Sequence, residues 1–565
     1  VYDFGRIFAG RVHLDLAGEP GRTLTLVHGE KLNDDGTVQV ASGLIDAQLQ
    51  THRYTFSSKD VEHWAPQFSY QGFRYVQLEN APGKPPLAAL TAETVHSRVA
   101  SAGEFGSSNA LLERIQAMAR HALENNRHGN QTDTPTLEKN GWTGDAQASA
   151  QANVLNFDLA RVWSKWLADF RDAQSAKGEI PEIVPSTPYY GYENTPGWGA
   201  LWGPVPSWDA ATFVLPWELY QAYGDRRILE QMYDTQKKLA DYTGSYFNAK
   251  LAYSNPNNFL LGEYASVMPP GGIIAALRLA PNGPIDATAS AYYYYMLDHL
   301  ARSAGLLGKG DDAQVYRARA EAVRMAYNER YWDAAAELYR MPGQKGEVKP
   351  FAETPNILAV AFGIAPAGHE AAIMKHVADD IATRGDHLGC GVYAGRYVMT
   401  LLSDYGYADL AYRVATREDF PSWGYWLANG LQSMAEGWEL SSRSWDHHYW
   451  ASISSYFYQG LAGIRAGSPG YAQIVIAPRP PAGLDAAHAQ IETLRGPVRS
   501  SWTRSAHEFA LEVSVPAGAS AQVRVPGAGA RLAQEPAGAS FVRVEGDAAE
   551  YSVGAGDYRF SYTLK

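Results

Sequence analysis

A run of carboxylates around one indole lies between residues 133 and 145. It reads Asp-Thr-Pro-Thr-Leu-Glu-Lys-Asn-Gly-Trp-Thr-Gly-Asp and contains Asp133, Glu138, Trp142 and Asp145. Asp145 alone is equally well explained as a helix cap, because Asp and Thr side chains satisfy the free amides at a helix N-terminus. A cap does not explain Glu138, or an indole set between two glycines. We therefore expect this segment to form an acidic site.

A second candidate segment, residues 418–447, combines rings, acids and histidines. It contains Pro-Ser-Trp-Gly-Tyr-Trp, Glu-Gly-Trp-Glu and Asp-His-His, and its candidate site residues are Trp423, Glu436 and His447. His447 and His448 are neighbours, and adjacent side chains on a helix diverge, so they form a poor metal pair. The single cysteine, Cys390, excludes a multi-cysteine zinc site and a disulfide within the chain. We expect neither a metal site nor a cofactor.

Two further segments add rings and acids. Residues 173–207 are rich in Pro, Tyr and Trp and lead into Trp208 and Asp209, and residues 248–285 contain Glu263 and Tyr264. The rings in residues 173–207 have no obvious core to fill, and they resemble the wall of a sugar-binding site, whereas the pattern at Glu263 and Tyr264 is less specific. Asp209 fits equally well as a first-turn acid of a helix, so both interpretations stay open.

Two carboxylates across an aromatic-lined mouth suit the cleavage of a glycosidic bond. One gives a proton to the departing oxygen, and the other serves as base or nucleophile on the opposite face of the sugar. The transition state is cationic, so additional carboxylates nearby stabilise it. Glu138 and Glu436 are the candidates for this pair.

The elements that position these segments are helical. Apolar residues recur at spacings of three and four, as in Leu159, Trp163, Trp166 and Phe170, which is the period of a helix with one buried face. We predict helices over 109–124, 144–155, 158–172, 208–223, 226–247, 286–305, 310–331, 355–363, 369–382, 390–404, 405–417 and 448–464.

Long connections follow alternate predicted helices. They span 125–143, 173–207, 248–285, 332–354 and 418–447, with a moderate one at 383–389, whereas connections in compact domains usually take a few residues. If the helices alternate up and down, the long connections emerge at one end, where function is expected. Six helix pairs closed into a ring form an (α/α)6 barrel. In such a ring the first and last loops are neighbours, so Glu138 would face Glu436.

Both ends of the chain carry β signals. Short alternating or β-branched runs, separated by Gly and Pro, occur at 12–16, 23–27, 70–78, 473–476, 509–515, 521–525 and 558–563. This spacing is typical of β-sandwiches. We therefore predict a central (α/α)6 barrel over 105–468, an N-terminal β-sandwich domain over 1–104 and a C-terminal β-sandwich domain over 469–565. Because Val1 already lies in a strand-like run, we expect that an upstream segment is missing, and the compartment stays open.

Composition excludes several classes of protein. Of the 565 residues, 46% are apolar and 19% charged, which fits a globular chain and excludes intrinsic disorder. No apolar run reaches the roughly 18–20 residues of a membrane helix. The net charge of −12, without basic runs, argues against nucleic acid and anionic lipid as partners. The oligomeric state stays open.

At the residues described above, the chain resembles bacterial α-L-rhamnosidases of glycoside hydrolase family 78. The resemblance spans essentially the whole chain, and its most specific motif is Gly-Trp-Thr-Gly-Asp-Ala from Gly141, with Glu138 four residues before the Trp. It implies an (α/α)6 barrel between β-sandwich domains, and inverting, exo-acting release of terminal α-L-rhamnose from a carbohydrate. It also implies that Glu138 is the general acid and Glu436 the general base. Sugar contacts are implied for Asp133, Trp142, Asp145 and His447.

The chain departs from the family pattern around both glutamates. Thr136 and Leu137 stand where an arginine usually precedes the acid, and the usual Trp-Glu-Arg-Trp around the base reads Ala-Glu-Gly-Trp. A lost hydrogen bond to a sugar shifts discrimination strongly, so one alternative is the same mechanism on a modified rhamnose or another deoxy or acidic sugar. A second alternative, suggested by the changed neighbours of Glu436, is a non-catalytic carbohydrate-binding protein.

Overall fold

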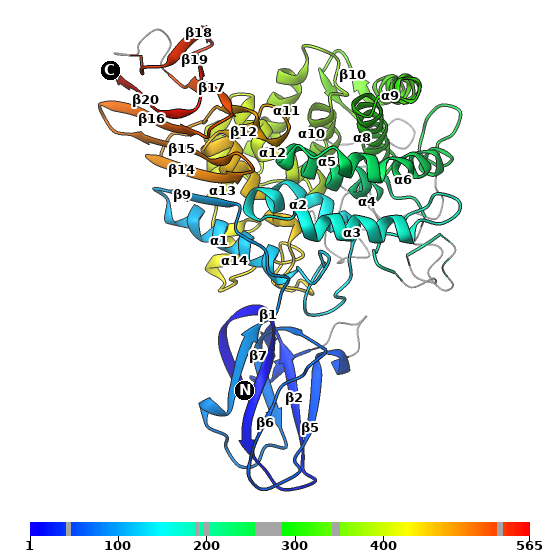
Figure 1. Ribbon diagram of the computed structural model, residues 1–565, viewed down its shortest axis with the longest axis vertical. Coiled ribbons are helices and arrows are strands. Elements are labelled where there is room, and N and C mark those ends of the chain that lie inside the picture. The colour runs from blue at the N-terminus through cyan, green and yellow to red at the C-terminus, as the bar shows by residue number, and fades with distance from the viewer. Residues whose placement is uncertain are drawn as a thin grey trace.

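The chain folds into three parts: the N-terminal β domain lies at one end of the longest axis of the molecule, and the helical body and the C-terminal β domain lie side by side at the other (Figure 1). In this computed structural model the described residues are 1–40, 47–186, 191–193, 195, 203–254, 285–341, 351–527 and 535–564. An N-terminal β domain, drawn in blue, lies below a body of helices, and a C-terminal β domain lies at the upper left. The predicted arrangement of a helical barrel between two β domains is confirmed.

The N-terminal β domain is built around one sheet with its own core. The strand order is β5-β2-β7-β1-β6, and β8 also pairs with β1. The bounds are β1 Tyr2–Ala17, β2 Thr23–Gly29, β3 Lys31–Leu32, β4 Val38–Gln39, β5 Thr51–Thr55, β6 Val61–Trp64, β7 Gln71–Glu79 and β8 Leu90–Thr94. Val12 and Leu14 alternate with less buried residues along β1 and belong to a core with Leu26 and Phe73. Glu30 and the small β3–β4 hairpin follow β2 directly.

The middle of the chain is helical. Its α-helices are α1 Ala110–Asn125, α2 Thr143–Asn156, α3 Ala160–Ala173, α4 Pro206–Asp209, α5 Ala211–Tyr223, α6 Arg227–Gly244, α8 Ile285–Leu306, α9 Gly310–Tyr331, α10 Glu353–Phe362, α11 Glu370–Thr383, α12 Val392–Asp404, α13 Ala408–Ala415, α14 Trp423–Ala428 and α15 Ile453–Tyr456. A short 3-10 helix, η3 Tyr449–Ser452, leads into α15, and a π-helical turn, η4 Phe457–Leu461, follows it. Two-residue strands β10 Trp332–Asp333 and β11 Leu338–Tyr339 form a hairpin after α9.

The helices form two concentric rings. α2, α5 and α10 are buried on most sides, whereas α3, α6 and α11 each bury one face, which is expected of an inner and an outer ring. Within the described residues α2 packs on α5, α5 on α8, α8 on α10 and α10 on α12. α12 then contacts α15 and η3, and both of these contact α2. The ring therefore closes, and the segments that lead into α2 and η3 are neighbours.

The limits of several helices follow from single residues. The Asn109 side chain caps α1 by accepting a hydrogen bond from the backbone N–H of Leu111 at 2.9 Å. α5 and α10 end at Gly224 and Gly363, whose φ angles of 69° and 73° lie in the left-handed region that glycine tolerates. The Asn109 cap therefore sets where α1 begins, and the two glycines set where α5 and α10 end.

The C-terminal β domain contains two sheets. Their strand orders among the described residues are β12-β13-β17-β19-β18 and β20-β16-β15-β14-β9. The bounds are β9 Gly103–Ser107, β12 Ile464–Ala466, β13 Gln473–Ile476, β14 Ala486–Thr493, β15 Gly496–Arg504, β16 Glu508–Val515, β17 Ser520–Val525, β18 Ala539–Glu545, β19 Ala548–Val553 and β20 Gly556–Thr563. β9 precedes the barrel in the chain but pairs antiparallel with β14. One strand of this domain therefore precedes the barrel helices in the chain, and the other strands follow them.

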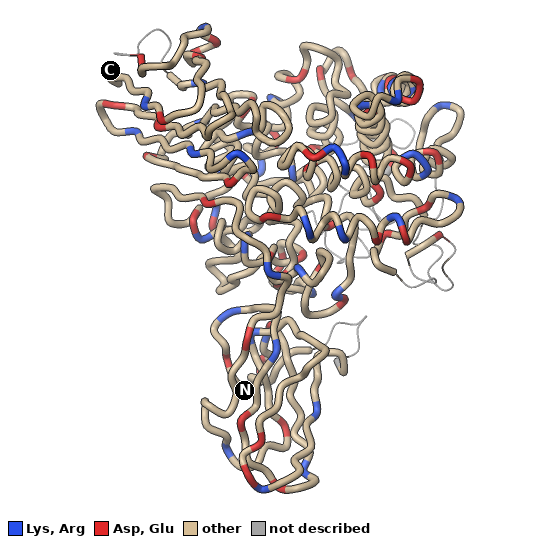
Figure 2. The backbone as a smooth tube through the Cα atoms, viewed as in Figure 1, with Lys and Arg blue, Asp and Glu red and all other residues tan. Residues whose placement is uncertain are grey.

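Charged residues are distributed over all three parts of the molecule. Figure 2 shows basic and acidic positions interspersed along the backbone rather than gathered by sign. Among the helices of the described chain, none has the length and apolar character needed to cross a membrane.

Candidate active site

The two glycines around Trp142 allow close packing at the start of α2. A β-carbon on Gly141 would lie 1.9 Å from the carbonyl oxygen of Val184, and one on Gly144 would lie 2.4 Å from the Trp208 ring. Because neither approach leaves room for a side chain, both positions need glycine. The packing fixes Trp142 at the N-cap of α2, with Glu138 in the preceding turn.

Glu138 and Asp133 lie together at this helix start. The Trp142 indole N–H donates to Glu138 Oε2 at 2.7 Å, and the backbone N–H of Asn140 donates to Asp133 Oδ1 at 2.8 Å. Asp133 is only 2% exposed. Burial, together with the charges of Glu138 and Asp145, raises the pKa of Asp133 well above its usual value. The predicted acidic cluster is therefore present, and its members interact.

Arg443 joins Glu138 to Glu436. Its Nη1 donates to Glu138 Oε1 at 3.1 Å, and its Nη2 donates to Glu436 Oε1 at 2.7 Å. Its Nε lies 3.3 Å from Glu436 Oε2. Since both terminal nitrogens are bonded to one carbon, the two carboxylate oxygens they contact lie within about 8 Å of each other. The segments that precede α2 and η3 thus bring these two distant glutamates to one place.

Asp145 and His447 form a second link between the same segments. His447 Nε2 lies 2.5 Å from Asp145 Oδ1, and the His447 backbone N–H donates to the Met434 carbonyl at 2.7 Å. Asp145 is 7% exposed and His447 4%. The neighbouring His448 is fully buried and contacts Ser149 Oγ at 2.8 Å; burial lowers its pKa well below the usual value. His447 therefore belongs to the site, and His448 packs inside the inner ring.

Two residues of the N-terminal β domain, Glu30 and Lys31, also reach the candidate site, and no sequence pattern pointed to them. Glu30 is 3% exposed; it accepts a hydrogen bond from the Trp445 backbone N–H at 2.7 Å and another from the Thr136 hydroxyl. The Lys31 ammonium donates to the carbonyl of Ser442 and lies 4.5 Å from the Trp445 ring centroid. Burial raises the pKa of Glu30 and lowers that of Lys31. These contacts attach the β domain to the segments that carry both glutamates.

A second buried acidic pair lies behind Trp142. Glu182 and Asp209 are 1% and 3% exposed, and Asp209 Oδ2 accepts a hydrogen bond from the Thr243 hydroxyl at 3.2 Å. Burial raises the pKa of both carboxyl groups, and the charge of Asp209 raises the pKa of Glu182 further. Asp209 was predicted as a candidate, whereas Glu182 was not, because nothing in the local spacing distinguishes it.

Other predicted candidates do not lie on an open wall. Trp208 is 3% exposed; its ring lies under Gly144 and makes an edge contact with Tyr393. Trp423 is 2% exposed and packs edge-on against Trp438 and Trp450. Both rings therefore support the site from within the core. Glu263 and Tyr264 lie outside the described residues.

The described part of the chain holds no group of three or more His, Cys, Asp or Glu side chains arranged to bind a metal ion.

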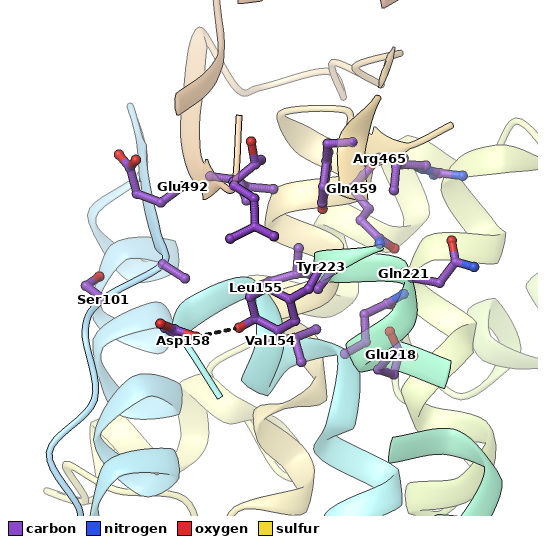
Figure 3. A pocket seen from close by; sticks show the side chains of 18 of the residues that line it. Ser101, Val154, Leu155, Asp158, Glu218, Gln221, Tyr223, Gln459, Arg465 and Glu492 are labelled. Atoms are coloured by element: carbon purple, nitrogen blue, oxygen red, sulfur yellow. Dashed lines mark hydrogen bonds between the residues drawn. The ribbon is translucent and has the colours of Figure 1, made fainter. Parts of the chain in front are cut away.

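A cavity of about 590 Å³ lies at the opposite end of α2 from Glu138 (Figure 3). Its walls include Leu155, Asp158 and Tyr223 from the barrel and Glu492 from β14. Because neither Glu138 nor Glu436 lines it, this cavity is separate from the candidate active site.

Three family models match successive parts of the chain. The bacterial α-L-rhamnosidase concanavalin-like domain matches residues 1–101, the six-hairpin glycosidase domain residues 100–461, and the C-terminal domain residues 463–540. The chain belongs to the bacterial α-L-rhamnosidase family. The resemblance to glycoside hydrolase family 78 predicted from the sequence is thereby confirmed.

Individual α-L-rhamnosidases are similar along nearly all of the chain. An α-L-rhamnosidase of Streptomyces avermitilis is 31% identical over 99% of this chain and 52% of its own length. The crystal structure of the Streptomyces avermitilis α-L-rhamnosidase complexed with L-rhamnose has a TM-score of 0.86 at 29% identity, covering 100% of this chain and 52% of that one. The structure of the α-L-rhamnosidase from Dictyoglumus thermophilum has a TM-score of 0.85 at 28% identity, covering 100% of this chain and 61% of that one. The chain spans about half the length of the curated relatives it matches.

Proposed function

We propose that this chain is the catalytic part of an exo-acting α-L-rhamnosidase that hydrolyses terminal α-L-rhamnosides with inversion. The observation that carries the proposal is the guanidinium of Arg443, because it contacts Glu138 and Glu436 at the same time. In inverting glycosidases the two carboxyl groups stand roughly 6.5–9.5 Å apart, with space for a sugar and a water between them. The Arg443 contacts hold one oxygen of Glu138 and one of Glu436 within about 8 Å of each other, which is compatible with that range.

In the proposed mechanism Glu138 is the general acid. Its carboxyl proton passes to the glycosidic oxygen as the bond from that oxygen to the anomeric carbon breaks. Glu436 takes a proton from the water that attacks the opposite face, so the product leaves with the inverted anomeric configuration. The charge of Asp145 reaches the neighbouring Asp133, and negative charge at this place stabilises the cationic transition state.

Rhamnose as the sugar is supported by the Streptomyces avermitilis relative, whose structure is described as a complex with L-rhamnose. We extend this specificity to the present chain as part of the proposal, with a carbohydrate bearing terminal rhamnose as substrate. Asp133, Trp142, Asp145 and His447 are the proposed sugar contacts. Trp208 and Trp423 are left out of that set because their rings pack against other core rings, Trp208 against Tyr393 and Trp423 against Trp438 and Trp450.

One observation favours the alternative sugar. The turn before Glu138 presents no cation to a ligand, because it carries the uncharged Thr136 and Leu137, which are 6% and 7% exposed. A modified rhamnose, or another deoxy or acidic sugar, would then be selected by other groups at the mouth. The same mechanism would apply, and a panel of aryl glycosides separates the two substrates.

The test is sugar release by wild-type protein and by Glu138→Gln and Glu436→Gln variants. Each variant should reduce turnover of an aryl α-L-rhamnoside by orders of magnitude while the protein stays folded. Glu418→Gln is the matched control, because Glu418 is an exposed acid in the same late segment. NMR of the freed sugar should first detect the β-anomer. Retention of configuration, or full activity of either variant, would contradict the assigned roles, and any turnover excludes a purely binding protein.

A further inference from the structure

Arg443 contacts both the proposed acid and the proposed base, each through a different nitrogen. We propose that Arg443 is a positioning residue that fixes the distance between Glu138 and Glu436 and balances their charge throughout turnover. This inference rests on the function proposed above and adds a role that neither the sequence motifs nor the comparisons assign. The side chain is 29% exposed, while those of Glu138 and Glu436 are 17% and 9% exposed.

The backbone around Arg443 is held on several sides. The Glu436 N–H donates to the Ser444 carbonyl at 3.0 Å, and the Gly437 N–H donates to Ser442 Oγ at 2.9 Å, so Arg443 and Glu436 belong to one closed loop. Ser444 Oγ also lies 2.8 Å from Thr134 Oγ1, four residues before Glu138. A guanidinium on so constrained a loop can set the position of Glu138 relative to Glu436.

The charge of the pair explains why a cation is needed beside it. Whenever both carboxyl groups are ionised they repel each other at this spacing, and burial strengthens the repulsion. During the proposed reaction Glu138 loses a proton and Glu436 gains one, so a single negative charge moves from the base to the acid. Because Arg443 contacts both groups, it can neutralise that charge before and after the transfer without moving.

The other cations near the site have different partners. Lys139, next to Glu138, donates to the Tyr70 carbonyl and to Gln71 Oε1 at 2.6 and 2.7 Å, which draws it toward the N-terminal β domain. Lys31 interacts electrostatically with Glu436, but its ammonium donates hydrogen bonds to the backbone carbonyls of Leu440 and Ser442. Among the described residues, Asp133 interacts with the charges of Glu138 and Asp145, Asp145 pairs with His447, and Glu30 interacts with Lys31 and His447. Neither lysine therefore duplicates the double contact of Arg443.

The experiment compares Arg443→Met, Arg443→Lys and Arg443→Ala with wild-type protein on an aryl α-L-rhamnoside. We expect Arg443→Met to lower kcat on the order of 100-fold, because small displacements of catalytic groups have effects of that size. Arg443→Lys should recover part of the loss, since an ammonium keeps the charge but not the two-pronged contact. Added guanidinium ion should partly restore Arg443→Ala. Arg417→Met is the control, because Arg417 pairs with Asp419 on the surface.

The pH dependence distinguishes positioning from a merely structural role. Without the cation both carboxyl groups hold their protons more tightly, so both limbs of the kcat/KM profile should move up by roughly one pH unit in Arg443→Met. A loss of activity with unmoved limbs and a lowered melting temperature would overturn the proposal. So would Arg443→Met retaining most of kcat while Glu138→Gln and Glu436→Gln are inactive.

A measurement without substrate separates this proposal from the proposed function. A double-mutant cycle on thermal unfolding, with Arg443→Met and Glu138→Gln singly and together, should give non-additive shifts in melting temperature. Additive shifts would contradict the link even in an active enzyme. Full activity of Glu138→Gln and Glu436→Gln would refute the catalytic roles, and with them the role of Arg443 in turnover.

Discussion

Glu30 provides a test of whether the N-terminal β domain takes part in catalysis. Its carboxylate accepts hydrogen bonds from Trp445, two residues after Arg443, and from Thr136, two residues before Glu138. Glu30→Ala would leave the buried Thr136 hydroxyl and the partly buried Trp445 N–H without this acceptor, and each such loss costs about 1–3 kcal/mol. If about 1.4 kcal/mol of this loss adds to the activation free energy, kcat falls about tenfold. We therefore predict a decrease in kcat of tenfold or more for Glu30→Ala.

The assay combines kinetics with hydrogen exchange. The amide of Trp445 should exchange faster in Glu30→Ala than in wild-type protein, because its acceptor is gone, while amides in the inner ring keep their protection. Glu30→Gln should be intermediate, since an amide accepts through one oxygen only. Glu19→Ala, which removes an exposed acid of the same domain, is the control. Unchanged kcat together with unchanged exchange at Trp445 would refute the idea that this domain positions the catalytic segments.

Three further predictions concern packing, the second link and pH. Gly144→Ala places a β-carbon 2.4 Å from the Trp208 ring, so calorimetry should show a lower melting temperature and assays a loss of activity; Gly305→Ala, with open space around it, should show neither. His447→Ala removes the 2.5 Å contact to Asp145 and should lower kcat/KM at least tenfold; unchanged steady-state kinetics would contradict this. Burial raises the pKa of Glu353 to about 8 from 4.5, so the folded protein keeps a proton that the unfolded chain releases. Stability from this group should be lost as pH rises through that window, and thermal scans from pH 5 to 9 should show a smaller decline for Glu353→Gln.

Helices with clear periodicity could be predicted from the sequence, and irregular ones could not. The helix expected at 310–331 matches α9 at both ends, and Trp163, Trp166 and Phe170 are buried on α3 as their spacing indicated. The helix expected over 208–223 is instead two, α4 and α5, which meet at Ala210. That expected over 448–464 is divided into η3, α15 and a π-helical turn. Hydrogen-bond patterns of this kind depend on tertiary packing, and apolar spacing such as that of Trp450, Ile453, Phe457 and Leu461 does not distinguish them from one α-helix.

The candidate site was predictable where function is encoded locally. Glu138, Trp142 and Asp145 are close in sequence, and ring closure brought Glu436 and His447 to them as expected. Glu30 and Arg443 were missed because nothing in the local pattern around either residue marks it, and only the folded chain shows their contacts with Trp445 and Glu138. The buried rings of Trp208 and Trp423 illustrate the reverse limit, since composition alone does not distinguish a sugar platform from a core residue.

The pairing of β9 with β14 sets an order of events during synthesis. Synthesis of β9 is complete at Ser107, but its partner β14 begins at Ala486. Every helix of the ring is therefore made before the two strands can pair. At about 5–20 residues per second this delay is on the order of tens of seconds. During that time β9 exposes an unpaired strand edge on the nascent chain, where another strand could add. Correct assembly of the C-terminal sheet is therefore a late step, completed only when both ends of the helical ring are present.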